Sequence, residues 1–106
     1  MQFESAKATL TPESKPILDR VVDILRRYPS YQLAIGGHTD SIGEEGPNQR
    51  LSEARAKTVN DYIIAAGIPV ARVSYAGFGE SMPIADNKFE AGRKQNRRVT
   101  LDLLVP

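Results

Sequence analysis

Apolar residues recur at helical spacing in two stretches of the chain, and this pattern predicts two main helices. On the first helix the apolar face is formed by Ile17, Leu18, Val21, Leu25 and Tyr28. Thr11 and Pro12 are typical of a helix start, and Pro29 should end this helix. The second helix is predicted over residues 48–66, because Gly67 follows as a typical C-terminal cap.

Short runs of alternating apolar and polar residues predict the strands. A first, weakly patterned strand is expected over residues 2–7, and clearer ones over 32–36 and 72–78. A final strand is expected over residues 97–105, where apolar side chains alternate at every second position. The segment 79–94 shows no regular pattern, so we expect it to be irregular.

The predicted order of elements is therefore β-α-β-α-β-β. It favours an α+β fold, in which a single-layer mixed β-sheet carries the two main helices packed on one face. The 106 residues fit a single domain, 1–106, with no internal repeat. Because the strand pattern starts directly after Met1, we interpret the chain as a fragment of a longer, membrane-anchored protein.

Composition excludes several classes of function. The chain has no cysteine, which removes disulfides, thiolate nucleophiles and thiolate metal sites. Its net charge of +1 is too small for a general nucleic-acid binder. No apolar run approaches the roughly 20 residues that cross a bilayer, so any membrane attachment must come from other parts of the parent chain. Nothing in the sequence specifies an oligomeric state.

One charged residue does not fit its position on the second helix. Arg55 falls in the middle of the apolar stripe that Leu51, Val59 and Tyr62 define. A buried guanidinium keeps its charge and must find acceptors. Asp40 precedes it in the loop that leads from a predicted strand into this helix.

Two interpretations of Asp40 and Arg55 follow from this placement. Spacing alone favours a structural ion pair, because structural networks often produce such pairs. A buried ion pair, however, is a poor device for stability, since desolvation can cancel its Coulomb energy. The second interpretation is therefore a ligand site on a cleft wall, where loops at strand ends often bind ligands.

Several short motifs then identify a resemblance that covers nearly the whole chain. They are Gly37-His38-Thr39-Asp40-Ser41, Asn48, Leu51-Ser52, Arg55-Ala56, Val59, Gly67-Ile68, Tyr75-Ala76-Gly77-Phe78-Gly79-Glu80, Pro83 and Asn96-Arg97-Arg98-Val99. This series resembles the signature of OmpA-like C-terminal domains, the family that includes peptidoglycan-associated lipoproteins and the stator protein MotB.

The resemblance implies a domain that binds peptidoglycan noncovalently through meso-diaminopimelate of the stem peptide. It would tether a parent protein to the cell wall from the periplasm, attached to the outer membrane rather than the inner one. The ligand-binding positions that it implies are Asp40, Arg55, Thr39, Asn48, Arg98 and Glu4. Asp40 and Arg55 match the two principal positions. Arg98 is preferred over Arg97 by strand alternation, and Glu4 stands where the family often has an acid.

Other candidate chemistries are weaker. His38 is the only histidine, so we expect no metal site, and no cofactor motif is present. Ser52 lacks a nucleophile elbow, and we expect no enzymatic activity. The basic run 93–98 is short and lacks interleaved aromatics, which argues against nucleic acid. The alternative function is a protein-interaction module of the cell envelope, with Asp40–Arg55 as a structural ion pair.

Overall fold

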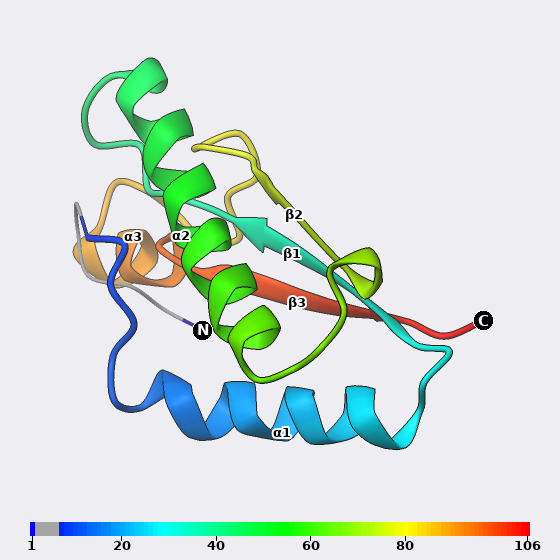
Figure 1. Ribbon diagram of the computed structural model, residues 1–106. Coiled ribbons are helices and arrows are strands. Elements are labelled where there is room, and N and C mark those ends of the chain that lie inside the picture. The colour runs from blue at the N-terminus through cyan, green and yellow to red at the C-terminus, as the bar shows by residue number, and fades with distance from the viewer. Residues whose placement is uncertain (2–6) are drawn as a thin grey trace.

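The computed structural model describes Met1 and residues 7–106. Its elements are α1 (Ser14–Arg27), β1 (Gln32–Gly37), α2 (Glu45–Ala65), the 3-10 helix η1 (Val70–Arg72), β2 (Val73–Gly77), α3 (Glu90–Asn96) and β3 (Val99–Leu104) (Figure 1). The strand expected over residues 2–7, and with it Glu4, lies outside the described residues. The α+β class, the two main helices and the later strands are confirmed.

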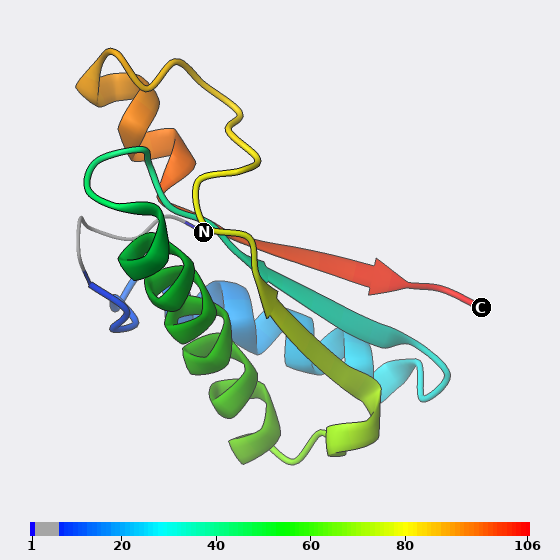
Figure 2. The same ribbon diagram turned by 90° about the horizontal axis from the view of Figure 1, so that it is seen from above.

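The three strands that the structure describes form a mixed sheet in the order β2-β1-β3. β1 pairs in parallel with β2, so α2 is the crossover between them, and β1 pairs antiparallel with β3. Figure 2 shows the three strands side by side, with the loops that follow β1 and β2 at one end. Thr39 and Asp40, two of the predicted ligand positions, follow β1 at this end of the sheet.

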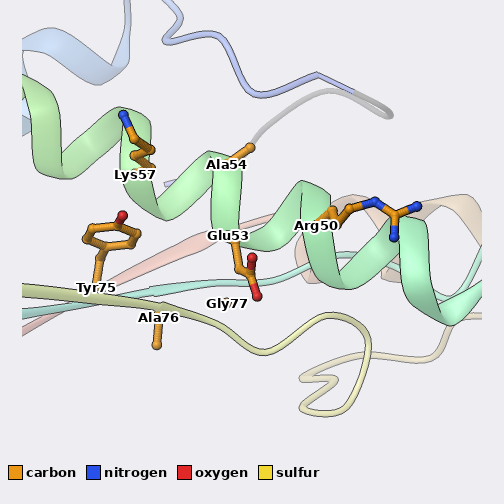
Figure 3. A pocket seen from close by; sticks show the side chains of 7 residues that line it. All are labelled: Arg50, Glu53, Ala54, Lys57, Tyr75, Ala76 and Gly77. Carbon is orange, nitrogen blue, oxygen red and sulfur yellow. The ribbon is translucent and has the colours of Figure 1, made fainter.

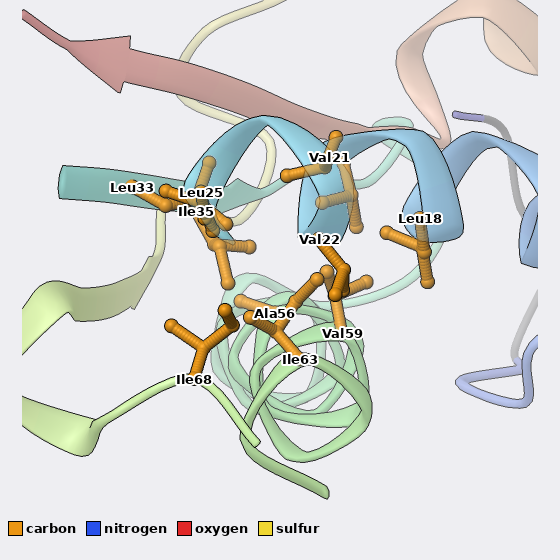
Figure 4. Packing of buried hydrophobic residues seen from close by; sticks show 11 residues of the cluster. Leu18, Val21, Val22, Leu25, Leu33, Ile35, Ala56, Val59, Ile63 and Ile68 are labelled. Atoms are coloured by element: carbon orange, nitrogen blue, oxygen red, sulfur yellow. The ribbon is translucent and has the colours of Figure 1, made fainter. Parts of the chain in front are cut away.

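Both main helices cover one face of the sheet. Leu33 and Ile35 of β1 belong to one buried cluster with α1 and α2 (Figure 4). The fully buried side chains Leu18 and Leu25 of α1 and Ile63 of α2 all belong to this cluster. The predicted stripes are therefore confirmed in part: Leu18, Val21 and Leu25 of α1 are buried, whereas Ile17 and Tyr28, which were assigned to the same face, are exposed.

Each main helix begins differently from the sequence prediction. α1 starts at Ser14, because the backbone around Pro12 forms a turn in which Ser14 N donates to Thr11 O (3.1 Å). α2 starts at Glu45, three residues before the predicted start. It includes Pro47 in its first turn, where the missing N–H costs nothing because backbone N–H groups there have no helical partner.

A short third helix, α3, occupies the end of the segment expected to be irregular. It was missed because seven residues with no apolar periodicity give no helical signal. The buried residues of α3 are Gly92 and Asn96, and neither has an apolar side chain that could form a stripe facing the core. The final strand consequently begins at Val99 rather than at Arg97.

α2 lies very close to the sheet because two neighbouring strands end in glycine. Gly37 and Gly77 are register partners on β1 and β2. A methyl group on Gly37 would lie 1.9 Å from the carbonyl oxygen of Ser52, and one on Gly77 would lie 2.5 Å from Glu53 N. Only glycine at these positions permits the approach that carries the next turn of α2, with Arg55, onto the end of the sheet.

The far end of α2 matches the prediction more closely. Gly67 has a positive φ of 102°, the left-handed conformation that commonly ends a helix, and its N–H donates to Ile64 O (2.9 Å). Arg26 of α1 donates to Ala66 O (2.6 Å) and so joins the two helices there. Among the described helices, none is both long and apolar enough to cross a membrane.

Candidate functional site

A pocket of about 300 Å³ opens where the loop after β1 meets the first half of α2 and the end of α3. It is lined by Thr39, Asp40, Ile42, Pro47, Asn48, Leu51, Arg55 and Arg97. Four of the predicted ligand positions thus come together in one hollow. The charged groups in its wall are unusual because they are almost fully buried.

Asp40 is 5% exposed and accepts hydrogen bonds on both carboxylate oxygens. The N–H of Ile42 donates to Oδ1 (3.0 Å), and the Nη1 of Arg97 donates to Oδ2 (3.0 Å). The first hydrogen bond closes a local turn that orients the carboxylate, and the second is part of a buried ion pair. A carboxylate has room for about four hydrogen bonds, so Asp40 keeps capacity to accept from a further donor.

Arg55 is fully buried, as its place on the helix predicts. Its Nε donates to Lys7 O (2.8 Å) and its Nη1 to His38 O (2.9 Å), so it connects α2 to two other segments of the backbone. Burial lowers the pKa of Arg55 from its ordinary value to about 10, and the charge of Asp40 opposes this shift. Arg55 is therefore still a cation at neutral pH.

Arg97 supplies the second guanidinium of the pocket. It stands at the C-terminal cap of α3, and its two Nη atoms bridge two carboxylates: Nη1 binds Asp40 and Nη2 donates to Glu90 Oε1 (2.7 Å). The hydrogen bond that Arg97 donates to Glu90, and then the one that it donates to Asp40, raise the pKa of Arg97 against the effect of burial. The ion pair that the structure shows at Asp40 is thus with Arg97.

The structure places Arg97, rather than the preferred Arg98, in the pocket. Alternation within a strand was the basis for choosing Arg98, but Arg97 precedes β3 and caps α3. Arg98 donates from Nη2 to Met82 O (2.8 Å), and it is not among the lining residues. Glu4 belongs to the part of the chain that the structure leaves undescribed.

Thr39 and Asn48 hold the backbone around Asp40. Thr39 N donates to Gly79 O (2.9 Å), which ties the loop after β1 to the loop after β2. Asn48 Nδ2 donates to Ile42 O (3.0 Å) from the first half of α2. Both residues line the pocket, so they fix its shape as well as contributing polar surface.

Asn96 is a structural support of the site, although the sequence pointed to it only as part of the family motif and indicated no role for it. It is fully buried, and its Oδ1 accepts from Ile84 N (2.8 Å) and Ala85 N (3.1 Å). Its Nδ2 donates to Ala85 O (3.0 Å) and Asn87 Oδ1 (2.8 Å). The loop before α3 is thereby fastened next to Arg97. The sequence signal that could have pointed to Asn96 is an uncharged asparagine within the basic run 93–98.

His38 lies directly behind the pocket, and its backbone is part of the frame. Its N–H donates to Arg98 O (2.9 Å) while its carbonyl accepts from Arg55. The ring is 3% exposed and stacks on Phe78, with centroids 5.4 Å apart. Nδ1 has no hydrogen-bond partner among the described residues. Burial first, and then the nearby Arg98, lower the pKa of His38 from 6.5 to about 4.

This lowered pKa predicts that the domain loses stability in mild acid. The folded state favours neutral His38, so its stabilising contribution is complete above about pH 6.5 and is lost as the pH falls toward 4. Between pH 7 and pH 4 we expect His38 to account for a loss of about 1–3 kcal/mol. Urea unfolding of the wild type and His38→Gln at both pH values measures this difference. Equal pH dependence of the two proteins would refute it.

A second hollow, of about 540 Å³, lies on the opposite side of α2, along the edge strand β2 (Figure 3). Its charged lining residues, Arg50, Glu53 and Lys57, are exposed, and Lys57 pairs locally with Asp61 (2.9 Å). Solvated side chains of this kind need no ligand to neutralise them. The smaller pocket, with its buried charges, is therefore the candidate site. Within residues 7–106 and Met1, no cluster of three potential metal ligands is present.

Comparisons with known proteins agree with this fold. A family model described as the OmpA family matches residues 2–97. The chain is 39% identical over 99 residues to outer membrane porin F of Pseudomonas fluorescens, covering 93% of this chain and 30% of that protein. It is 41% identical over 99 residues to the peptidoglycan-binding protein ArfA of Mycobacterium tuberculosis, again covering 93% of this chain and 30% of that protein.

A solved structure shows the same architecture. The crystal structure of the peptidoglycan-associated lipoprotein from Burkholderia pseudomallei superimposes with a TM-score of 0.94 at 25% identity. The match covers 97% of this chain and 87% of that one. The present chain thus corresponds to under a third of the two curated relatives but to most of this solved domain. The chain belongs to the OmpA family.

Proposed function

We propose that this domain binds peptidoglycan noncovalently, through the meso-diaminopimelate of the stem peptide. The observation that carries the proposal is the pocket in which buried Asp40, Arg55 and Arg97 lie together. It supplies an anion and two cations within one small hollow. A ligand that matches it carries an ammonium and a carboxylate close together.

The free end of diaminopimelate has this chemistry, because an ammonium and a carboxylate are attached to one carbon. Asp40 accepts hydrogen bonds from the ammonium, while the guanidinium groups of Arg55 and Arg97 attract the carboxylate. The first turn of α2 adds the positive end of the helix dipole, and Asn48 brings that turn to the pocket. Thr39 and Asn48 serve as supporting residues.

Two relatives support peptidoglycan as the partner. One is named as a peptidoglycan-binding protein, and the solved neighbour is a peptidoglycan-associated lipoprotein. Other relatives are outer-membrane proteins, which supports a periplasmic position for this domain. In this proposal the domain is one part of a longer envelope protein, which it tethers to the wall from the outer membrane. Modest affinity for each stem suffices, because the wall presents many stems at high local concentration.

Calorimetric titration with meso-diaminopimelate, run beside lysine, tests the proposal. With its α-amino and α-carboxyl groups blocked as amides, as they are in a stem peptide, lysine keeps the side-chain ammonium but lacks the second carboxylate. One charge-assisted hydrogen bond contributes about 1.5–3 kcal/mol, so we expect lysine to bind roughly tenfold to a hundredfold more weakly. Equal affinities would contradict recognition of the head group, and absence of binding to both would remove diaminopimelate as the ligand.

Incubation with purified sacculi separates binding from catalysis. We expect the domain to sediment with the sacculi and to release no soluble fragments. Release of muropeptides or free stems would show hydrolysis instead. Failure to sediment, with a folded protein, would favour the alternative of a protein-interaction module in which the buried charges are structural.

A further inference from the structure

We propose that Glu90 is a positioning residue of the diaminopimelate site, which holds the Arg97 guanidinium in place against Asp40. This inference rests on the proposed function above. Glu90 is not in the pocket lining and carried no signal in the sequence. Its role follows from what it does to Arg97.

The geometry is a chain of alternating charges that runs from the pocket to the surface. Arg97 donates from Nη1 to Asp40 (3.0 Å) and from Nη2 to Glu90 (2.7 Å), and Glu90 Oε2 also accepts from Arg93 Nε (3.1 Å). Both terminal nitrogens of Arg97 are thus engaged by carboxylates. A guanidinium is planar, so two fixed ends determine the direction in which the whole group points.

The two carboxylates differ in how firmly they are held. The side chain of Asp40 is 7% exposed and already ordered by the Ile42 N–H, whereas the side chain of Glu90 is 63% exposed. Glu90 gains its order from α3, since residues seven apart lie on the same side of a helix, separated by about 10 Å along its axis. The length of α3 therefore places Glu90 where it can reach back to Arg97.

Without Glu90, Arg97 would keep only one of the two carboxylates described here. A long side chain held at fewer points samples more rotamers and must be ordered again when a ligand binds. The hydrogen bond from Arg97 also lowers the pKa of the Glu90 carboxyl, which keeps it ionised across the neutral range. Glu90 thus pre-organises the cation without touching the ligand.

Titration of Glu90 variants with meso-diaminopimelate tests this role. Exposed ion pairs contribute modestly, so we expect Glu90→Ala to weaken binding about fivefold and Glu90→Gln, which keeps an acceptor, about twofold. Asp61→Ala is the matched control, because it removes another exposed ion pair, to Lys57, on the far side of α2. It should leave the affinity unchanged.

A double-mutant cycle separates positioning from a general effect on the fold. In the Arg97→Ala background, Glu90→Ala should weaken binding no further, because there is no guanidinium left to position. An equal loss in both backgrounds would overturn the proposal, as would wild-type affinity in Glu90→Ala.

An observation without ligand distinguishes this proposal from the proposed function itself. Side-chain N–H signals of Arg97 in ¹H–¹⁵N spectra should exchange slowly in the wild type and in Asp61→Ala, and faster in Glu90→Ala. If the wild type fails to bind diaminopimelate but these signals respond, the ligand assignment is wrong while the positioning of Arg97 stands. Unchanged Arg97 signals in Glu90→Ala would refute the positioning role.

Discussion

Replacing Arg55 by glutamine is expected to weaken the binding of meso-diaminopimelate by about 100-fold. The loss combines one charge-assisted contact to the ligand carboxylate with the loosening of the loop that Arg55 holds through His38 O. Arg55→Lys should also bind poorly, about tenfold below wild type, because an ammonium cannot reproduce the planar fork. Calorimetry at a temperature well below the melting midpoint of each variant measures both effects.

Stability provides the second readout for Arg55. Loss of its bonds to Lys7 O and His38 O should lower the free energy of unfolding by about 2–4 kcal/mol. Arg50→Gln is the control, since Arg50 is an exposed arginine of the same helix that lines a different hollow from Arg55. It should change neither property. If Arg55→Gln melts earlier yet binds diaminopimelate and sacculi like the wild type, the buried guanidinium is purely structural and the site assignment fails.

Substitution of Gly37 by alanine should destabilise the whole domain. The added methyl group would lie 1.9 Å from the carbonyl oxygen of Ser52, and that oxygen belongs to a helix backbone that cannot rotate away. α2 must then move off the sheet. We expect the free energy of unfolding to fall by about 3 kcal/mol and the melting midpoint by more than about 10 °C.

Gly46→Ala is the matched control for this prediction. Gly46 lies in the first turn of α2, where a methyl group would meet only the Nη1 of Arg50, at 3.7 Å. Alanine there should leave stability unchanged or raise it by up to about 1 kcal/mol through its higher helix propensity. Similar melting of the two variants would show that the close approach of α2 to β1 is not tightly constrained.

The burial of Arg55 could be predicted because it follows from the position of this residue on a single helix. Once the apolar residues of α2 define a stripe, any charge within that stripe must be buried. The same reasoning identified the buried Leu18, Val21 and Leu25 of α1, although it omitted buried Val22 and included two exposed residues. Local periodicity is enough for these conclusions, and the resemblance to OmpA-like domains added the ligand chemistry.

The roles of Gly37, Gly77 and Arg97 could not be predicted from the periodicity of apolar residues along the chain. Gly37 and Gly77 matter together only because β1 and β2 pair in a particular register, which the sequence does not state. Strand alternation favoured Arg98 because the final strand was predicted to begin at Arg97, which instead caps α3 and precedes β3. The local pattern there was strand-like, but hydrogen bonds from Asn96 and Arg97 to distant segments decided the conformation.

The way Asn96 binds the loop before α3 has a consequence for how this region can vary. Three of its four hydrogen bonds go to main-chain atoms of Ile84 and Ala85, so they recognise the path of the loop and not its side chains. Changes of residue type at these positions can therefore be tolerated, whereas a deletion or insertion would shift the bonded atoms out of reach. Variation in length, more than variation in composition, is what would disconnect this loop from the binding pocket.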